Sequence, residues 1–254
     1  MDFRRIGSLR VSLVGLGCNN FARRLDYERT ASVVDAALDA GINFFDTADI
    51  YGGTKSEEFL GRALGGRRES VILATKFGMT VDDRRDGASQ DYVRQACEDS
   101  LRRLRTDHID LYQLHMPDSR TPIAQTLDAL GDLVRQGKVR EIGCSNFGAR
   151  QLRDAADAAG TGARFVSVQN EYSLLHREPE KDVLQECARQ GLAFLPYFPL
   201  ASGLLTGKYA AGRPAPAGTR LAGRSPGVSL LSDRNLTIAE ALPLLHRQAG
   251  NQGF

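Results

Sequence analysis

The chain alternates between short apolar runs and amphipathic stretches, and this alternation limits the folds open to it. Each apolar run followed by a helical stretch is typical of a βαβ unit, in which right-handed crossovers join parallel strands. The sequence therefore predicts an α/β fold with a parallel sheet. We predict strands at residues 11–17, 42–46, 71–76, 109–115, 139–145, 165–170 and 192–198, and helices at about residues 28–40, 56–65, 89–104, 122–136, 148–159 and 180–190.

Two architectures could contain the seven predicted parallel strands, a doubly wound sheet and a barrel, and the glycine pattern distinguishes between them. A doubly wound sheet would carry a Gly-x-Gly-x-x-Gly fingerprint after its first strand. Gly15 and Gly17 supply the first two glycines of that fingerprint, but no third glycine follows at the required spacing. We therefore expect an α/β TIM barrel in one domain covering residues 1–254. Two further runs, 3–6 and 9–13, flank Gly7-Ser8 and predict an N-terminal β-hairpin.

Composition narrows the functional class. The net charge is +2 and the arginine pairs are scattered, so we expect no nucleic-acid partner. The four cysteines lie far apart without a Cys-x-x-Cys pair, which argues against a metal site and favours a reducing, cytoplasmic location. The N-terminus contains no apolar signal region, and the apolar stretch 192–205 is too short for a membrane helix.

Four polar residues lie where predicted strands end: Asp46 and Tyr51 after the second strand, Lys76 after the third and His115 after the fourth. In a barrel of parallel strands all these ends open onto one face, where the active site lies. Each residue alone has an ordinary structural explanation, such as a loop cap, a surface charge or a core histidine. Together, on three successive strands, they predict one proton-donating site.

That combination of side chains suits the reduction of a carbonyl group. Hydride addition to a carbonyl carbon creates an alkoxide, which needs a proton and an electropositive pocket. A phenol is a weak acid near neutral pH, and a neighbouring ammonium makes it a stronger one. We therefore expect Lys76 to assist Tyr51, Asp46 to hold Lys76 by a salt bridge, and His115 to orient the carbonyl.

The sequence resembles the aldo-keto reductase family, in particular bacterial members that are similar to potassium-channel β subunits. The resemblance extends to about Gly223, and its motifs include Phe45-Asp46-Thr47-Ala48-Asp49-Ile50-Tyr51-Gly52, Ala74-Thr75-Lys76-Phe77-Gly78, Asp110-Leu111-Tyr112-Gln113-Leu114-His115, Gly143-Cys144-Ser145-Asn146-Phe147, Val168-Gln169-Asn170-Glu171-Tyr172 and the segment from Pro199 to Tyr209. It implies a (β/α)8 barrel closed at its bottom by the hairpin, a small-molecule carbonyl substrate, and a catalytic tetrad of Asp46, Tyr51, Lys76 and His115.

The resemblance also implies a nicotinamide cofactor and residues that bind it. Ser145, Asn146 and Gln169 match positions that hydrogen-bond the carboxamide, and Tyr197 matches the ring that stacks on the nicotinamide. The matches for the pyrophosphate segment are Leu200, Ala201, Ser202, Gly203, Lys208 and Arg220, and Cys18 and Asn19 match positions that line the pocket. The cofactor implied is NADP(H), with NAD(H) not excluded, because no match is found for the eighth-strand residues that hold the 2′-phosphate.

The C-terminal part departs from the family pattern. After Tyr197 we predict a long loop over 199–229 and one helix over 233–248, and the only candidate for an eighth strand, 228–231, precedes that helix. We therefore expect a truncated barrel that lacks the eighth strand and the final helix. This expectation leaves open a catalytically weak relative that acts as a cofactor-binding or interaction module. A metal-dependent barrel enzyme is a third alternative, with Asp46, His115 and Glu171 as its imagined ligands.

Overall fold

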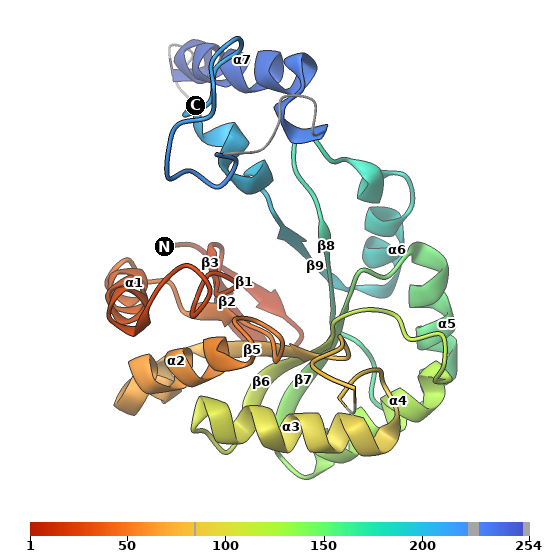
Figure 1. Cartoon of the computed structure of the whole chain (residues 1–254). Helices are drawn as coiled ribbons and strands as arrows, with labels where there is room; N and C mark the ends of the chain where they lie inside the picture. The colour runs from red at the N-terminus through yellow and green to blue at the C-terminus, as the bar shows by residue number, and fades with distance from the viewer. Residues whose placement is uncertain (84, 223–228, 251–254) are drawn as a thin grey trace. The chain divides into compact units, whose positions relative to one another are not determined.

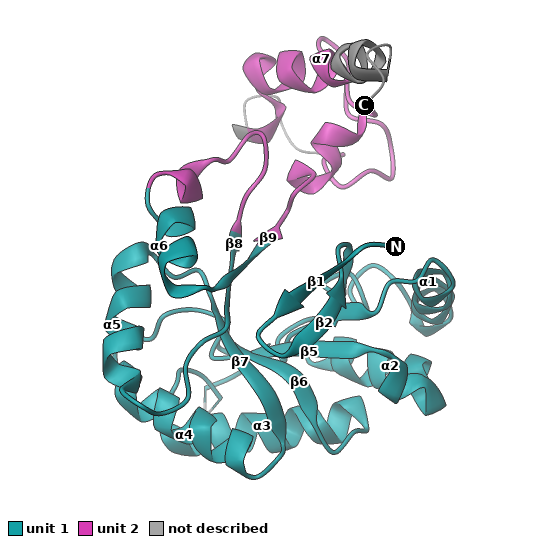
Figure 2. Cartoon of the chain, turned by 180° about the vertical axis from the view of Figure 1, so that it is seen from behind, with its two compact units in different colours: residues 1–170, 182–195 teal, residues 171–181, 196–254 magenta. Residues whose placement is uncertain are grey.

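A computed structural model describes residues 1–83, 85–222 and 229–250. The contacts divide the chain into two compact units, coloured separately in Figure 2. The first comprises residues 1–170 and 182–195, and the second comprises residues 171–181 and 196–254. The single domain expected from the sequence stays a prediction.

The first unit is built on a seven-stranded sheet whose strands follow one another in chain order (Figure 1). The pairs from the first strand to the sixth are parallel, and the last two strands run on into the second unit. This order is that of a (β/α)8-type barrel and confirms the predicted fold class. The strands are β3 (Gly15–Gly17), β4 (Phe44–Asp46), β5 (Ile72–Phe77), β6 (Ile109–Leu114), β7 (Val139–Ser145), β8 (Ser167–Glu171) and β9 (Ala193–Tyr197).

A helix follows each of the first six strands of this sheet, as the alternation of patterns predicts. In Figure 1 the helices from α2 to α5 lie on the outer side of the strands. Apolar residues of α3 to α6 pack against the outward side chains of β6, β7 and β8 in one buried cluster, and those of α1 and α2 form a second one against β4 and β5. The helices are α1 (Tyr27–Asp39), α2 (Lys55–Leu64), α3 (Gln90–Leu104), α4 (Ile123–Arg135), α5 (Ala149–Ala159) and α6 (Val183–Gln190), with 3-10 turns η1 (Gly65–Ser70) and η2 (Glu178–Glu180).

The predicted hairpin is present and packs against the inner face of the sheet. It consists of β1 (Phe3–Ile6) and β2 (Leu9–Ser12), and its apolar side chains share a buried cluster with Phe44, Ala74 and Leu111. Each of these three sheet residues lies two positions before an inward-facing polar residue of the same strand, so the hairpin covers the end of the barrel opposite those polar groups.

The predicted first barrel strand, 11–17, is too long. Its first two residues belong to the hairpin, and only its last three form β3. Ser12 and Asn43 exchange two hydrogen bonds, of 2.6 and 3.0 Å, which fix the end of the hairpin beside the start of β4. The chain then bends through Leu13 and Val14, which are more than half exposed, before it enters the sheet. Apolar character alone does not show this change of direction.

The second unit has a small core of its own. It contains two 3-10 segments, η3 (Ala201–Thr206) and η4 (Ser229–Leu231), and the helix α7 (Asp233–Gly250), whose position confirms the predicted C-terminal helix. The only candidate for an eighth strand, 228–231, is not a strand in its described part, which is η4, and Val228 lies outside the described residues. The buried core residues are Ala201, Leu204, Tyr209, Leu221, Leu236 and Ala239.

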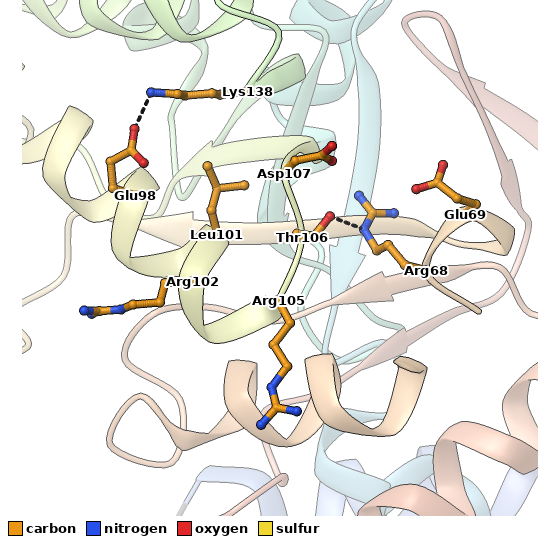
Figure 3. A pocket seen from close by; sticks show the side chains of 9 residues that line it. All are labelled: Arg68, Glu69, Glu98, Leu101, Arg102, Arg105, Thr106, Asp107 and Lys138. Carbon is orange, nitrogen blue, oxygen red and sulfur yellow. Dashed lines mark hydrogen bonds and ion pairs between the residues drawn. The ribbon is translucent and has the colours of Figure 1, made fainter. Parts of the chain in front are cut away.

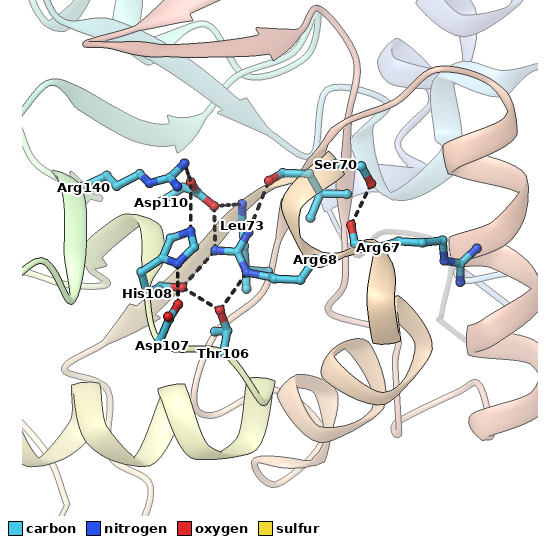
Figure 4. A network of polar contacts seen from close by, with 10 residues as sticks. Arg67, Arg68, Ser70, Leu73, Thr106, Asp107, His108, Asp110 and Arg140 are labelled. Atoms are coloured by element: carbon cyan, nitrogen blue, oxygen red, sulfur yellow. Dashed lines mark hydrogen bonds and ion pairs between the residues drawn. The ribbon is translucent and has the colours of Figure 1, made fainter.

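A buried ion-pair network stabilises the start of β6, at the end of that strand opposite His115 (Figure 4). Both carboxylate oxygens of Asp110 are paired, one with Arg140 at 2.7 Å and the other with Arg68 at 2.8 Å. The backbone N–H of Leu73 donates a further hydrogen bond of 2.9 Å to Asp110.

Among the helices described, none has both the length and the apolar character needed to cross a membrane.

Candidate active site

The structure brings the four residues of the predicted tetrad together at one end of the barrel in the first unit. Asp46 ends β4, Lys76 lies near the end of β5, and His115 directly follows β6. Tyr51 lies in the turn between β4 and α2. Because side chains alternate along a strand, Asp46 and Lys76 point inward while their neighbours face the helices.

Lys76 is the centre of this arrangement. Its side chain is fully buried, and Nζ donates hydrogen bonds to Asp46 Oδ2 at 2.5 Å, to the carbonyl oxygen of Thr47 at 2.9 Å and to the Tyr51 hydroxyl at 3.5 Å. Burial alone would lower the pKa of Lys76, but the charge of Asp46 and the Tyr51 hydroxyl outweigh it and raise the pKa. Lys76 therefore stays cationic over the physiological range.

Tyr51 lies between Lys76 and His115. Its ring meets the imidazole edge to face, with centroids 5.8 Å apart. Burial raises the pKa of Tyr51 above its usual value, and the ammonium of Lys76 opposes that rise. The lysine therefore acts in the direction expected from the sequence, but in this structure desolvation of the phenol is the larger effect.

His115 is buried and neutral. Burial, assisted by the charge of Lys76, lowers the pKa of His115 to about 3. Its Nδ1 atom is buried and has no hydrogen-bond partner among the described residues. A neutral imidazole offers one N–H donor, so His115 can donate a hydrogen bond to a carbonyl oxygen without adding a positive charge beside Lys76.

A polar cluster on the next two strands adjoins the tetrad. The hydroxyl of Ser145 donates to the carbonyl oxygen of Gln169 at 2.7 Å, and Asn146 Nδ2 donates to the carbonyl oxygen of His115 at 3.0 Å. Asn146 has a left-handed backbone with a φ of 62°, which turns its side chain back toward the strand ends. Gln169 Nε2 donates to Asp46 Oδ1 at 3.1 Å, so the cluster and the tetrad are directly connected.

Gln113 belongs to the site but does not stand out in the sequence. It is fully buried in β6, and its Nε2 donates to Asp46 Oδ1 at 3.0 Å. The available signal is its spacing: it lies two positions before His115, in a run whose other inward position is apolar Leu111. A polar residue facing inward in such a run indicates a partner inside the barrel.

Cys18 and Asn19 follow β3. Cys18 is fully buried, its backbone N–H donates to the carbonyl oxygen of Asp46 at 2.8 Å, and its carbonyl oxygen accepts from Ser56 at 3.0 Å. Burial, together with the charge of Asp46, raises the pKa of the Cys18 thiol. Asn19 is half-buried. As pocket-lining residues both stay predictions.

The other residues predicted to bind a cofactor lie in the second unit. Tyr197 packs edge to face on Phe198, with centroids 5.2 Å apart, and the guanidinium of Arg220 lies 5.0 Å from the Phe198 ring. The segment that begins at Leu200 continues through consecutive left-handed backbones at Ala201, Ser202 and Gly203. Gly203 has a φ of 92°, which favours glycine, and a Cβ on it would lie 3.2 Å from Lys208 Nζ.

A surface cavity lies away from the tetrad in the first unit. It has a volume of about 820 Å³ and lies beside the start of β6 (Figure 3). Lys138 and Glu98 pair across it, and Arg68 is already held by Thr106. These paired side chains serve structure, so the cavity is not our candidate site. The cavity is lined by Arg68, Glu69, Glu98, Leu101, Arg102, Arg105, Thr106, Asp107 and Lys138.

Among the described residues no group of three His, Cys, Asp or Glu side chains is arranged to hold a metal ion.

The sequence model of the aldo/keto reductase family matches residues 13–252, nearly the whole chain. The chain belongs to the aldo/keto reductase family. This assignment agrees with the barrel order of the strands and confirms the resemblance seen in the sequence motifs.

Several relatives carry oxidoreductase names. Together with the family match, these names identify the chain as an oxidoreductase. An uncharacterized oxidoreductase of Bacillus subtilis, YrpG, is 42% identical over 243 residues, which cover 89% of this chain and 73% of the relative. An aldo-keto reductase of Fusarium vanettenii is 37% identical over 81% of this chain and 65% of the relative. A second Bacillus subtilis oxidoreductase, YqkF, is 35% identical over 82% of this chain and 68% of the relative. The matches thus span about two thirds to three quarters of these relatives.

The polar groups of this aldo/keto reductase suit a nicotinamide cofactor, as expected of the family. A carboxamide presents one acceptor and two donors. Within the first unit the Asn146 amide donates to the Ser145 hydroxyl at 3.1 Å, and that hydroxyl donates to the backbone carbonyl oxygen of Gln169 at 2.7 Å. In the second unit, Lys208 is a cation of the kind that binds phosphate, and its side chain lies beside Gly203. Each unit by itself thus contains groups that suit one part of such a cofactor.

Proposed function

We propose that the protein reduces aldehydes or ketones to alcohols with NADPH. The observation that supports this best is the contact of Lys76 Nζ with both Asp46, at 2.5 Å, and Tyr51, at 3.5 Å. A buried ammonium held by a carboxylate beside a phenol is an arrangement for proton donation to a developing alkoxide. The cofactor, when bound, supplies the hydride.

Tyr51 is the proton donor in this proposal. Its hydroxyl proton passes to the carbonyl oxygen as the C–O double bond becomes a single bond, and the phenolate left behind is stabilised by Lys76. The ion pair with Asp46 keeps Lys76 in place and charged while this happens. In the protein without substrate, burial raises the pKa of Tyr51. The phenol therefore keeps its proton until negative charge develops on the substrate oxygen.

His115 orients the substrate. Its pKa of about 3 keeps the imidazole neutral at physiological pH, and its ring contacts that of Tyr51 edge to face. A neutral N–H donor beside the phenol directs the carbonyl oxygen toward the Tyr51 hydroxyl. On the cofactor side, Ser145, Asn146 and Gln169 bind the carboxamide. Lys208 and Arg220 supply positive charge to the phosphates of the cofactor, and NADPH, which carries one phosphate more than NADH, is the cofactor of this proposal.

The test follows the oxidation of NADPH by absorbance with a generic aromatic aldehyde, for the wild type and for Tyr51→Phe. We expect turnover by the wild type and a loss of at least about a hundredfold in the variant, because the phenolic proton is gone while the ring stays. Equal rates for the two proteins would reject Tyr51 as the donor.

A binding measurement separates loss of chemistry from loss of cofactor. NADPH and NADH are each titrated into the wild type and Tyr51→Phe, and the shift of the melting temperature is recorded. We expect both proteins to bind NADPH alike and more tightly than NADH. Tight binding by a wild type that never turns over would instead favour a cofactor-binding module.

A further inference from the structure

Two glutamine amides converge on one oxygen of Asp46. Gln113 Nε2 lies 3.0 Å and Gln169 Nε2 lies 3.1 Å from Asp46 Oδ1, while Lys76 occupies Oδ2. The two glutamines come from different strands, β6 and β8, so their contacts approach the carboxylate from separate parts of the barrel. Asp46 thus accepts three side-chain hydrogen bonds, and its carboxylate plane is fixed relative to Lys76.

We infer that Gln113 and Gln169 form an amide clamp that positions Asp46, and through it Lys76, for proton donation by Tyr51. A carboxylate with a single partner can rotate about its Cβ–Cγ bond. Donors on both of its oxygens remove that freedom. The clamp adds no charge, so it holds Asp46 without competing with the Lys76 ammonium for the negative charge.

The orientation of the Gln113 amide follows from its partner. Asp46 accepts from Lys76 as a carboxylate, so only the NH₂ group of Gln113 can face it. The Oε1 atom of Gln113 then lies buried without a hydrogen-bond partner among the described residues. An unpaired buried acceptor costs free energy that an apolar side chain of the same size would avoid. The residue therefore contributes more through its contact with Asp46 than through packing.

The neighbouring strand leaves space for this contact. Gly143 on β7 is the cross-strand partner of Gln113. A Cβ on Gly143 would lie 3.3 Å from Gln113 Cγ and 2.5 Å from the hydroxyl of Ser167. Glycine at this position thus gives Gln113 the room to extend toward Asp46, because a Cβ would clash with Ser167 and press on the Gln113 side chain.

The two members of the clamp differ in what else they face. Gln169 adjoins the cluster that we propose for the cofactor carboxamide, because its carbonyl oxygen accepts from the Ser145 hydroxyl. Gln113 is enclosed in the barrel interior and has Asp46 as its hydrogen-bond partner. Loss of Gln169 should therefore affect cofactor binding as well as turnover, whereas loss of Gln113 should affect turnover alone.

Kinetics of Gln113→Met provide the first test, which rests on the proposed function. Methionine keeps the volume but removes the donor. We expect kcat to fall by about tenfold or more with little change in KM for the aldehyde. The alkaline limb of the kcat profile should move to lower pH, because a loosened Asp46 raises the pKa of Lys76 less. Tyr112→Phe, which removes a buried hydroxyl without a partner from the same strand, is the matched control and should leave the profile unchanged.

Gln113→Glu adds a signature that packing cannot produce. At acidic pH the introduced carboxyl is protonated and can donate to Asp46, so activity should approach that of the wild type. As the carboxyl ionises, it repels Asp46 and activity should fall more steeply than in Gln113→Met. Parallel pH profiles for wild type, Gln113→Glu and Tyr112→Phe would overturn the clamp.

A stability cycle tests the clamp without any turnover. Gln113→Met should lower the midpoint of urea unfolding in the wild type. In an Asp46→Ala background it should leave the midpoint unchanged or raise it, because the contact is already absent there and methionine removes an unpaired buried amide. Equal lowering in both backgrounds overturns the clamp. If Asp46→Ala does not fold, urea unfolding of Gln113→Glu is measured as a function of pH instead. The midpoint should fall as the introduced carboxyl ionises, and a midpoint that does not change with pH would contradict the clamp. If Gln113 and Asp46 are coupled in stability but the protein does not reduce aldehydes, the proposed function is rejected and the clamp is kept.

Discussion

The ammonium of Lys76 lies 3.5 Å from the phenolic oxygen of Tyr51. The same ammonium lies over the Tyr51 ring, 5.1 Å from its centre. Since Lys76 has no exposed surface, water cannot screen this contact. The proximity of the two groups is therefore the feature on which the proposed proton transfer depends.

Replacing Lys76 by methionine should abolish most of the activity. The variant keeps the length of the side chain but leaves the Tyr51 phenolate without a counter-charge, so we expect kcat to fall by about 10² to 10⁴. Stopped-flow or steady-state reduction of an aromatic aldehyde measures it. Asp46 also loses its cation, so circular dichroism must show that the variant is folded. Activity within threefold of the wild type would contradict the role of Lys76.

Much of this site is predictable from the sequence, because strand periodicity decides which residues face inward. Asp46 and Lys76 fall at strand ends by spacing alone, and the structure brings them into contact. Gln113 is not predictable in the same way. Its partner Asp46 lies 67 positions away, and whether the two side chains meet depends on strand register and on the space left by Gly143. A single sequence contains neither.

The balance of forces on Tyr51 is also beyond the sequence. A lysine nearby predicts a lower pKa for the phenol, but the outcome depends on how completely the phenol is buried, which only the packed structure shows. The change of direction at Leu13 and Val14 is a similar case. Their apolar side chains continue the predicted strand, while the hydrogen bonds between Ser12 and Asn43 end it.

His115 should make the fold less stable in acid. In the unfolded chain the imidazole takes up a proton near pH 6.5, whereas the buried imidazole stays neutral down to a pKa of about 3. The unfolded state therefore binds more protons in this window, and stability falls as the pH drops from 6.5 toward 3.

The measurement compares urea unfolding of wild type and His115→Gln at pH 7.5 and 4.5. Each pH unit in the window costs about 1.4 kcal/mol, so the wild type should lose roughly 2–3 kcal/mol more than the variant between the two pH values. The same loss for both proteins would show that His115 is protonated in the folded state at pH 4.5.

Asp49 should have the opposite dependence on pH. Burial, and then the charge of Glu57, raise the pKa of Asp49 to about 7, while Arg103 and the hydroxyl of Tyr92 oppose the rise. Its Oδ1 atom has no hydrogen-bond partner among the described residues. The folded state keeps this proton longer than the unfolded state does, so stability falls as the pH rises from about 4 to about 7.

Asp49→Asn removes this titration. We expect the variant to gain roughly 2–4 kcal/mol relative to the wild type when both are moved from pH 4.5 to pH 8, as measured by urea unfolding. Glu57 stays paired with Arg103 at 2.6 Å and with Thr75 at 2.5 Å in the wild type, so Glu57→Gln should destabilise at neutral pH. A gain from both substitutions at pH 8 would mean that the two carboxyls repel each other more than Arg103 holds Glu57.

Asp110→Asn should destabilise the fold without touching the chemistry. Asp110 is fully buried at the end of β6 opposite the tetrad and pairs with Arg68, whose side chain is only 11% exposed, and with Arg140 (Figure 4). Loss of the carboxylate leaves the Arg68 cation uncompensated in a buried position, which costs about 3–5 kcal/mol.

Asp35→Asn is the matched control, because Asp35 and its partner Arg67 are both about half exposed and such pairs contribute at most about 1 kcal/mol. Urea unfolding at neutral pH should separate the two variants, and at low urea both should keep the kcat of the wild type. A kcat that falls in Asp110→Asn alone, with the protein still folded, would show that the network at the start of β6 also positions the strand end that carries Gln113 and His115.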